Sequence, residues 1–221
     1  MSTRSFLVPD ALQAYLTAHS SGFDDVARSL ITETQSMDGP SGMQVSAEQG
    51  QLLGLLTRLV GARNAVEVGT FTGFSALCIA RNLADGGRLT CCDVSEQWTA
   101  IGRRHWALAG VEDRIDLQIA PAAETLAALP DVPVDLCFVD ADKGGYATYW
   151  DLLVPRMRPG GLLLVDNVLW SGRILDDPHD GRQDGADTLA LRAFNDKVAA
   201  DERVDVVLLP LFDGLTFAVK R

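Results

Sequence analysis

The chain has 221 residues, of which 47% are hydrophobic, so it is long enough for one domain with a substantial core. Its 30 acidic and 19 basic residues give a formal net charge of −11. A nucleic-acid-binding protein needs a surplus of lysine and arginine to bind the phosphate backbone. The charge therefore argues against nucleic acid as the main partner.

The amino-terminal segment MSTRSFLVPDALQAYL carries charges and a proline where a signal peptide needs an unbroken apolar stretch. No run approaches the ~18 apolar residues of a membrane-spanning helix. The amphipathic stretch at 6–20 also lacks the lysine and arginine cluster that binds membrane surfaces. We therefore expect a cytoplasmic protein that has no membrane contact.

Residues 1–63 are expected to be helical. Ser46 and Gln49 have the spacing of a capping box, in which the serine hydroxyl and the glutamine amide satisfy free backbone N–H groups. The Gly- and Pro-containing segment 37–45 before them is expected to be a loop. An apolar face should follow the capping box and pack on the sheet, formed by Leu52, Leu55, Leu56 and Leu59.

From residue 64 onward, short β-rich runs alternate with helix-length segments. The runs lie at 64–69, 88–94, 115–120, 134–140 and 161–168, and helical spacing of apolar residues marks 72–84 and 96–110. Such alternation predicts right-handed crossovers and a mostly parallel sheet that is covered on both faces.

The end of the chain departs from this alternation. Two further β-rich runs, 204–211 and 215–221, are separated only by the residues FDG. So short a connection permits a hairpin but no parallel crossover, so one of these strands must run antiparallel.

Four cysteines, Cys78, Cys91, Cys92 and Cys137, show no C-x-x-C spacing. Cys91 and Cys92 are adjacent and would point to opposite faces of a strand. We expect buried apolar thiols, with neither zinc nor disulfides.

The first candidate site follows the first predicted strand, in VEVGTFTGFSA at 66–76. Gly69 and Gly73 allow a tight turn and a close approach to a ligand, but the pattern is not the dinucleotide motif G-x-G-x-x-G. Glu67 would repel a pyrophosphate and attract an ammonium or sulfonium group. Asp93, at the tip of the second predicted strand, suits ribose hydroxyls. The residues thus indicate a ligand with a ribose and a positive charge, although an ordinary βα turn with a solvated Asp93 has the same sequence.

The second candidate site lies where the fourth and fifth predicted strands end. Asp140 ends one run, and Asp166 and Asn167 end the other, so their side chains should meet at the carboxyl edge of a parallel sheet. Such oxygen ligands suit Mg²⁺, with Mn²⁺ and Ca²⁺ as alternatives. The absence of histidine and cysteine from the set argues against zinc.

Lys143 follows Asp140 within one turn of the same loop. A divalent cation repels a charged lysine, which favours the neutral amine that can take a proton from a substrate hydroxyl. The alternative is that Asp140 and Asp142 are solvated loop acids and Lys143 forms a surface ion pair.

Taken together, these motifs resemble those of the metal-dependent class I O-methyltransferases of the catechol and caffeoyl-CoA type. The resemblance runs through SGMQVSAEQGQLLGLL, VEVGTFTGFSAL, FVDADKGGY, RPGGLLLVDNVLWSG and LPLFDGLTFAVKR, and so covers most of the chain. It implies one domain over 1–221, with a helical cap or dimer region at 1–63 and a Rossmann-like core at 64–221. It also implies a seven-stranded, mostly parallel sheet with an antiparallel carboxy-terminal strand.

The resemblance further implies site residues for S-adenosylmethionine, a divalent cation and an acceptor. The cofactor residues would be Met43, Val45, Glu67, Gly69, Thr70, Phe71, Ser75, Asp93, Ala122, Asp140 and Asp142. Asp140, Asp166 and Asn167 would bind the cation, and Asn167, Trp170 and Lys143 would face the acceptor. Lys143 would be the catalytic base, while Asp142 would support either the cofactor's amino group or Lys143.

The implied reaction is methylation of a catechol-like diol that chelates the cation, after Lys143 has removed one hydroxyl proton. Family members acting on CoA esters have basic residues in the loop after the fifth strand, whereas aspartates outnumber Arg173 and Arg182 at 173–188. We therefore expect a small catechol, an exposed His179 in this loop, and the homodimer usual for the family. The alternatives are an NAD-dependent oxidoreductase, a non-catalytic S-adenosylmethionine-binding regulator, and a methyltransferase whose metal site is dispensable.

Overall fold

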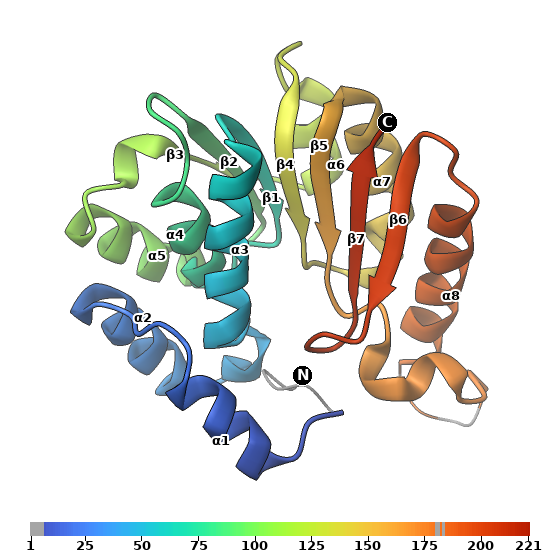
Figure 1. The fold of residues 1–221 in the computed structure, drawn as a ribbon, viewed down its shortest axis with the longest axis horizontal. Coiled ribbons are helices and arrows are strands. Elements are labelled where there is room, and N and C mark those ends of the chain that lie inside the picture. The colour runs from blue at the N-terminus through green and yellow to red at the C-terminus, as the bar shows by residue number, and fades with distance from the viewer. Residues whose placement is uncertain (1–6, 180–181, 183) are drawn as a thin grey trace.

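The structure is a computed structural model that describes residues 7–179, 182 and 184–221, and within these residues seven strands form one sheet (Figure 1). The strand order is β3-β2-β1-β4-β5-β7-β6. The strands are β1 (Asn64–Val68), β2 (Arg88–Asp93), β3 (Ile115–Ile119), β4 (Val134–Val139), β5 (Met157–Val165), β6 (Val204–Leu209) and β7 (Leu215–Lys220). Every run that the sequence predicts as a strand forms one.

Strand β7 runs opposite to its neighbours, as the short FDG connection requires. It pairs antiparallel with both β5 and β6, while β1 to β5 pair in parallel. The turn between β6 and β7 uses Phe212 and Gly214, which have positive φ angles of 55° and 87°. The predicted mostly parallel sheet with an antiparallel carboxy-terminal strand is therefore confirmed.

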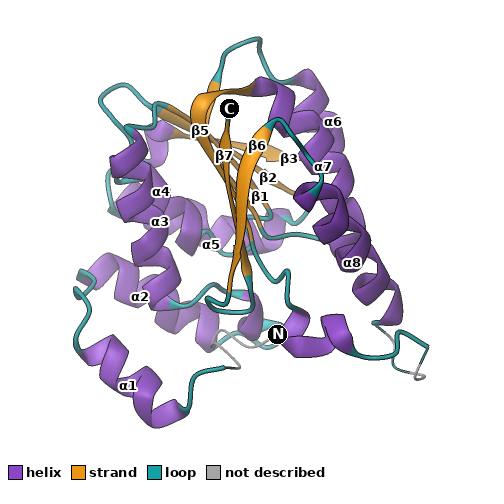
Figure 2. Cartoon of the chain, turned by 45° about the vertical axis from the view of Figure 1, so that its right-hand side comes forward, coloured by secondary structure: helices purple, strands orange, loops and turns teal. Residues whose placement is uncertain are grey.

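Helices cover both faces of the sheet (Figure 2). One face carries α3 (Ala47–Val60), α4 (Phe74–Ala80) and α5 (Glu96–Leu108), with α2 (Asp25–Gln35) packed outside them. The other face carries α6 (Ala122–Ala128), α7 (Tyr146–Leu153) and α8 (Gly185–Ala199). Short 3₁₀ turns are η1 (Ser41–Met43), η2 (Glu112–Arg114), η3 (Lys143–Gly145), η4 (Val154–Arg156) and η5 (Trp170–Leu175).

Helix α1 (Asp10–Ala18) differs from the others because it has no buried residue. Its Leu12, Tyr15 and Leu16 are all exposed. Among the described residues, no helix combines the length and the apolar character needed to cross a membrane.

The strands send alternate side chains into two cores, one on each side of the sheet. Cys91 belongs to the core under α3, α4 and α5, and its neighbour Cys92 belongs to the core under α6, α7 and α8. All four cysteines are free and buried, which confirms their predicted role as apolar core residues.

Strand β5 begins four residues earlier than the sequence indicates, at Met157 rather than Gly161. Val134 of β4 pairs with Met157, but Leu136 pairs with Leu162, so extra residues of β5 bulge out of the ladder. The bulge contains Pro159, which interrupts the pattern from which the strand was predicted.

Helix α3 begins as predicted, but only half of the predicted capping box forms. The Ser46 hydroxyl accepts a hydrogen bond from the backbone N–H of Gln49 (3.1 Å). The Gln49 amide does not return to Ser46; its Nε2 donates instead to Asp166 Oδ2 (2.7 Å). The helix is thereby joined to the end of β5.

The predicted packing face of α3 is half right: Leu52 and Leu56 are partly buried and pack against the core, but Leu55 and Leu59 do not. Leu53 is 1% exposed, whereas Leu55 and Leu59 are 50% and 80% exposed. The buried side also contains Gly50 and Gly54, where an added Cβ would lie within 2.7 Å of Phe74 Cε1 and 2.6 Å of Asn82 Nδ2, respectively. The glycines let α3 lie close to α4, so the side with Leu53 faces inward and the far half of the predicted face, Leu55 and Leu59, is exposed.

Truncating Leu53 should therefore destabilise the fold much more than truncating Leu59 on the same helix. We expect Leu53→Ala to lower the free energy of unfolding by ~2–5 kcal/mol, because it leaves a cavity in the core. Leu59→Ala should change it by less than ~0.5 kcal/mol, because Leu59 is exposed. Urea denaturation of both variants measures the difference, and equal losses would contradict this orientation of the helix.

Candidate functional site

A cavity of about 370 Å³ opens at the carboxyl edge of the sheet. It lies beside neighbouring strands β1 and β4, whose following helices α4 and α7 pack on opposite faces, the usual place for a ligand in such sheets. The predicted site residues in its lining are Met43, Val45, Gly69, Thr70, Phe71, Ser75, Asp93, Ala122, Asp140, Asp142 and Lys143. The structure brings these residues together, and their individual roles stay predictions.

The turn after β1 depends on two glycines. Gly69 has φ 87°, and a Cβ added there would collide with the carbonyl oxygen of Asp140, which follows β4. Gly73 has φ 81°, and its carbonyl oxygen accepts a hydrogen bond from Trp106 Nε1 (3.0 Å). Any other residue at these two positions would be strained, because the φ angles are positive and the neighbouring atoms are close. The glycines therefore shape this wall of the cavity.

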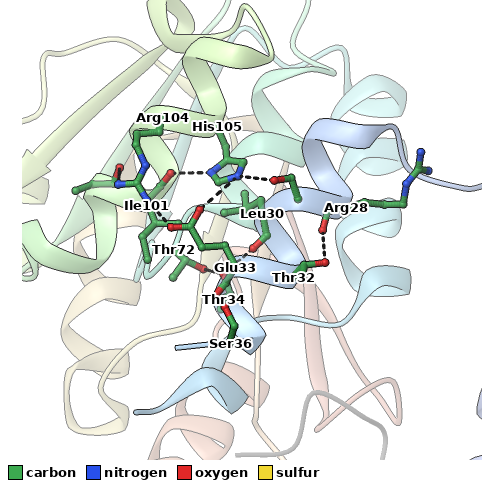
Figure 3. Close-up of polar contacts among 12 residues, drawn as sticks. Arg28, Leu30, Thr32, Glu33, Thr34, Ser36, Thr72, Ile101, Arg104 and His105 are labelled. Atoms are coloured by element: carbon green, nitrogen blue, oxygen red, sulfur yellow. Dashed lines mark hydrogen bonds and ion pairs between the residues drawn. The ribbon is translucent and has the colours of Figure 1, made fainter. Parts of the chain in front are cut away.

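Helix α2 supports the same turn from outside (Figure 3). The buried hydroxyl of Thr34 lies 2.9 Å from the hydroxyl of Thr72, within the Gly69 to Gly73 turn. Glu33, one residue earlier, pairs with Arg104 of α5, and His105 Nδ1 lies 3.0 Å from the carbonyl oxygen of Ile101. The Thr34 contact attaches the turn to α2, and the pair of Glu33 with Arg104 attaches α2 to α5.

Asp93 organises the turn as well as facing the cavity. Its Oδ2 accepts hydrogen bonds from the backbone N–H groups of Thr70 (3.0 Å) and Phe71 (2.7 Å), and Oδ1 accepts one from Ser95 (2.8 Å). A carboxylate has about four lone-pair positions, so little acceptor capacity is left for a ribose. The predicted bond to ribose hydroxyls would share oxygens that already hold the turn.

Glu67 lies on β1 and is completely buried. Burial raises the pKa of Glu67 to about 7; the polar groups of Ser75, Thr70 and Cys91 oppose this rise, and the charge of Asp93 adds to it. Its Oε1 has no hydrogen-bond partner within the described part of the chain. A buried acceptor without a partner is costly, which fits a carboxylate that receives a donor from a ligand.

Lys143 lies at the centre of the second candidate site and is 3% exposed. Its Nζ donates to Asn167 Oδ1 (2.7 Å), to Tyr146 OH (2.6 Å) and to Asp140 Oδ1 (3.2 Å). The prediction that the ends of β4 and β5 bring these side chains together is confirmed by these contacts. The alternative of an exposed surface ion pair is excluded by the burial of Lys143.

Asp166 is buried beside this cluster. Its Oδ1 accepts from the backbone N–H of Asn167 (2.7 Å), and Oδ2 accepts from Gln49 Nε2 (2.7 Å). Burial, followed by the charge of Asp140, raises the pKa of Asp166 to about 7. The site thus holds more carboxylate than the ammonium of Lys143 can neutralise.

Asn167 and Trp170 lie in the segment that leaves β5. Both have positive φ angles, 59° and 51°, and both are buried. The Trp170 ring centroid lies 5.7 Å from Lys143 Nζ, and its Nε1 has no hydrogen-bond partner among the residues described. Trp170 therefore faces Lys143, where the resemblance places the acceptor wall.

Asp142 contacts a residue that the sequence reading did not consider. Its Oδ1 accepts a hydrogen bond from Tyr149 OH (2.6 Å), and the contacts of Lys143 are made with Asp140, Asn167 and Tyr146 instead. The structure thus gives no support to a direct bond between Asp142 and Lys143.

Three residues of the site were missed from the sequence. Tyr146 and Tyr149 follow Lys143 by three and six residues, a helical spacing that could have placed them on one side. Gln49 was assigned to a local cap, and nothing in its surrounding sequence indicates a bond to Asp166.

In the described part of the chain, no three side chains among histidine, cysteine, aspartate and glutamate gather as a metal-binding group. The predicted cation ligands, Asp140, Asp166 and Asn167, are not such a group, because one of the three is an asparagine. Cation binding by it stays a prediction.

Comparisons with known proteins agree on one family. The model of the O-methyltransferase family matches residues 17–221. A Dictyostelium discoideum protein named "Probable caffeoyl-CoA O-methyltransferase 2" is 39% identical over 210 residues, which cover 93% of this chain and 90% of that protein. The mouse "Catechol O-methyltransferase domain-containing protein 1" is 38% identical over 214 residues, covering 95% of this chain and 79% of the mouse protein.

A solved structure agrees with the fold and the family. The crystal structure of a Bacillus cereus O-methyltransferase in complex with SAH has a TM-score of 0.86 and 29% sequence identity, and the match covers 96% of this chain and 97% of that one. The oxidoreductase and regulator alternatives are therefore wrong. The chain belongs to the O-methyltransferase family and is an S-adenosylmethionine-dependent O-methyltransferase.

Proposed function

We propose that the enzyme methylates one hydroxyl of a small catechol-like acceptor at a site that holds a divalent cation. Asp140, Asp166 and Asn167 would hold the cation, with Mg²⁺ the first choice, and Lys143 would be the general base. The buried contacts of Lys143 Nζ with Asn167 Oδ1 and Asp140 Oδ1 carry the proposal, because they join a base to the proposed ligands.

The donor set fits a hard divalent cation. Asn167 Oδ1 and Asp140 Oδ1 face one nitrogen, Lys143 Nζ, at 2.7 and 3.2 Å, and so lie close to each other. Asp166 adds a second carboxylate, whose pKa is raised to about 7 by burial and by Asp140. Carboxylate and amide oxygens are the ligands that Mg²⁺ prefers, and a cation would offset this excess of negative charge.

The cavity fits the methyl donor. Its lining is largely apolar at Phe71, Trp98 and Ala122, whereas Glu67 is not part of the lining but lies two residues before Gly69 as a buried acid with an unpaired oxygen. We propose that Glu67 faces the ammonium group of S-adenosylmethionine and that Asp93 faces the ribose. The B. cereus O-methyltransferase in complex with SAH supports this use of the cavity.

The methyl donor and the cation would supply one part of the chemistry, and side chains of the protein the other. S-adenosylmethionine supplies a methyl group on a positively charged sulfur, and the cation favours ionisation of a hydroxyl bound to it. Lys143 accepts the hydroxyl proton on Nζ, and Tyr146 and Trp170 hold its amine in place through their contacts at 2.6 and 5.7 Å. The cofactor would supply its methyl group to the ionised acceptor oxygen and leave as the neutral thioether, so correct positioning of the two by the residues of the site would contribute most to the rate.

The loop after β5 favours a small catechol over a CoA ester. Arg173 pairs with Asp184, and Arg182 pairs with Asp176 at 3.2 Å, so aspartates already engage both arginines of this loop. His179 is exposed there, as predicted. Phosphate groups of CoA would meet aspartates in this loop, which supports the smaller acceptor despite the name of the D. discoideum relative.

We further propose a cytoplasmic homodimer. The dimer rests on the resemblance to the family, and the exposed leucines Leu55 and Leu59 on α3 offer an apolar surface for it.

Methyl transfer to a panel of catechols and to caffeoyl-CoA should show activity that depends on Mg²⁺. We expect activity on free catechols, its loss in excess EDTA and its return with Mg²⁺. Mass spectrometry of the methylated products measures all three results. Activity that is indifferent to EDTA would show that the metal site is dispensable, and a preference for caffeoyl-CoA would overturn the proposed acceptor class.

Replacing Lys143 should separate catalysis from donor binding. Lys143→Ala should lower turnover by ~10²-fold or more, because the general base is lost, while the affinity for SAH changes little. Lys197→Ala removes a partly exposed lysine that pairs with Asp151, and serves as the matched control. Turnover of Lys143→Ala equal to that of Lys197→Ala would remove Lys143 from the mechanism.

The affinity for SAH should rise between pH 6 and pH 8 because of Glu67. With its pKa raised to about 7, Glu67 is mostly protonated at pH 6 and mostly ionised at pH 8, and only the ionised form attracts an ammonium. The dissociation constant should fall by about tenfold over this interval. Isothermal titration calorimetry at both pH values measures this. Glu67→Gln should remove the dependence and the exposed Glu124→Gln should keep it; an unchanged dependence in Glu67→Gln would refute this role.

A further inference from the structure

Gln49 connects helix α3 to the end of β5 through one buried hydrogen bond. Its Nε2 donates to Asp166 Oδ2 at 2.7 Å, and both residues are 3% exposed. The two residues are 117 positions apart in the sequence. Water has little access to this bond, so the chain itself must supply the donor for this carboxylate oxygen.

The two donors to Asp166 differ in origin. The first is the backbone N–H of Asn167, the next residue, which donates to Oδ1 at 2.7 Å. It moves with the Asp166 backbone and leaves the carboxylate able to turn about its side-chain bonds. The Gln49 donor comes from another layer of the fold and contacts the other oxygen. Together the two contacts fix the plane of the carboxylate.

Gln49 is itself held firmly. Its backbone N–H donates to the Ser46 hydroxyl (3.1 Å), which fixes the first turn of α3. Gly50, the next residue, lies against Phe74 of α4, and an added Cβ there would come within 2.7 Å of that ring. The amide of Gln49 therefore starts from a fixed backbone position and can hold Asp166 in one orientation.

The first turn of α3 also reaches the donor cavity. Val45, which precedes the Ser46 cap, lines that cavity and is 8% exposed. A single helix terminus thus contacts both the donor cavity and the carboxylate proposed to bind the cation.

We infer that Gln49 is a positioning residue for the cation site, which orients the Asp166 carboxylate through its side-chain amide. The inference rests on the proposed function, because it needs Asp166 to be a cation ligand. Loss of a hydrogen bond to a ligating carboxylate typically weakens metal affinity by ~10- to 100-fold.

The test compares Gln49→Met with Gln51→Met in the full-length protein. Methionine keeps the length and the helical preference of glutamine but has no N–H donor. Gln51 lies on the same helix, is half-buried and is not among the hydrogen-bond donors to Asp166, so it is the matched control. Mn²⁺ binding is measured by electron paramagnetic resonance, without donor or acceptor present. We expect Gln49→Met to bind Mn²⁺ more weakly by ~10-fold or more, and Gln51→Met to bind it as the wild type does.

A second readout separates positioning from stability. Gln49→Met should need a higher Mg²⁺ concentration for half-maximal methyl transfer but should approach the wild-type rate at saturating Mg²⁺. Its SAH affinity and circular dichroism spectrum should match those of Gln51→Met. If methionine disturbs folding, Gln49→Leu provides a second side chain without a donor.

The outcomes distinguish this inference from the proposed function. Wild-type Mn²⁺ affinity in a folded Gln49→Met variant would overturn the role of Gln49 and leave the cation site standing. If the wild-type protein binds no Mn²⁺, or if Asp166→Ala binds it as the wild type does, the proposed ligand set fails and the inference falls with it. A lowered melting temperature with unchanged Mn²⁺ affinity would show that Gln49 has a structural role alone.

Discussion

The close approach of the ends of β1 and β4 is the constraint on which the rest of the site depends. Gly69 after β1 lies so near the backbone of Asp140 that no side chain fits between them. The two strands are neighbours at the point where the chain changes from one face of the sheet to the other. Residues 69–72 therefore border the cavity on one side, and residues 140–143 border it on the other. A methyl donor held by the first segment, as we propose, would lie beside Lys143, the proposed base in the second segment.

Buried charge is the second determinant of the site. Asp140, Asp166 and Lys143 bring two carboxylates and one ammonium into a region with little solvent, and the pKa of Asp166 rises to about 7 as a result. A protein that needed only stability would be served better by apolar side chains here, because desolvated charges cost free energy. The buried carboxylates are explained if a cation binds between them and offsets their negative charge. The contacts of Lys143 Nζ with Asp140 Oδ1 and Asn167 Oδ1 show that these two oxygens point to the same place.

Most of the fold could be predicted because its signals are local. Each strand run, the antiparallel β7 and the Ser46 cap follow from residues within a few positions of one another. The errors concern contacts between residues far apart in the sequence. The face of α3 depends on how closely Gly50 and Gly54 approach α4, and the pattern of leucines therefore included two exposed residues, Leu55 and Leu59. The start of β5 depends on a bulge that only its pairing with β4 reveals. The Gln49 bond to Asp166 spans 117 positions, and the sequence around either residue carries no sign of it.

These cross-layer contacts also explain how one site can serve two chemical tasks. The proposed donor side is formed by β1, β2 and the turn at 69–73, which α2 and α5 support through Thr34 and Trp106. The proposed acceptor side is formed by the ends of β4 and β5 and by Trp170, beyond which the loop continues to α8. Changes in that loop can alter the acceptor without disturbing the turn that faces the donor, because the two are attached to different helices. Asp140 borders the cavity and also contacts Lys143. A substitution of Asp140 would therefore affect both sides of the site at once.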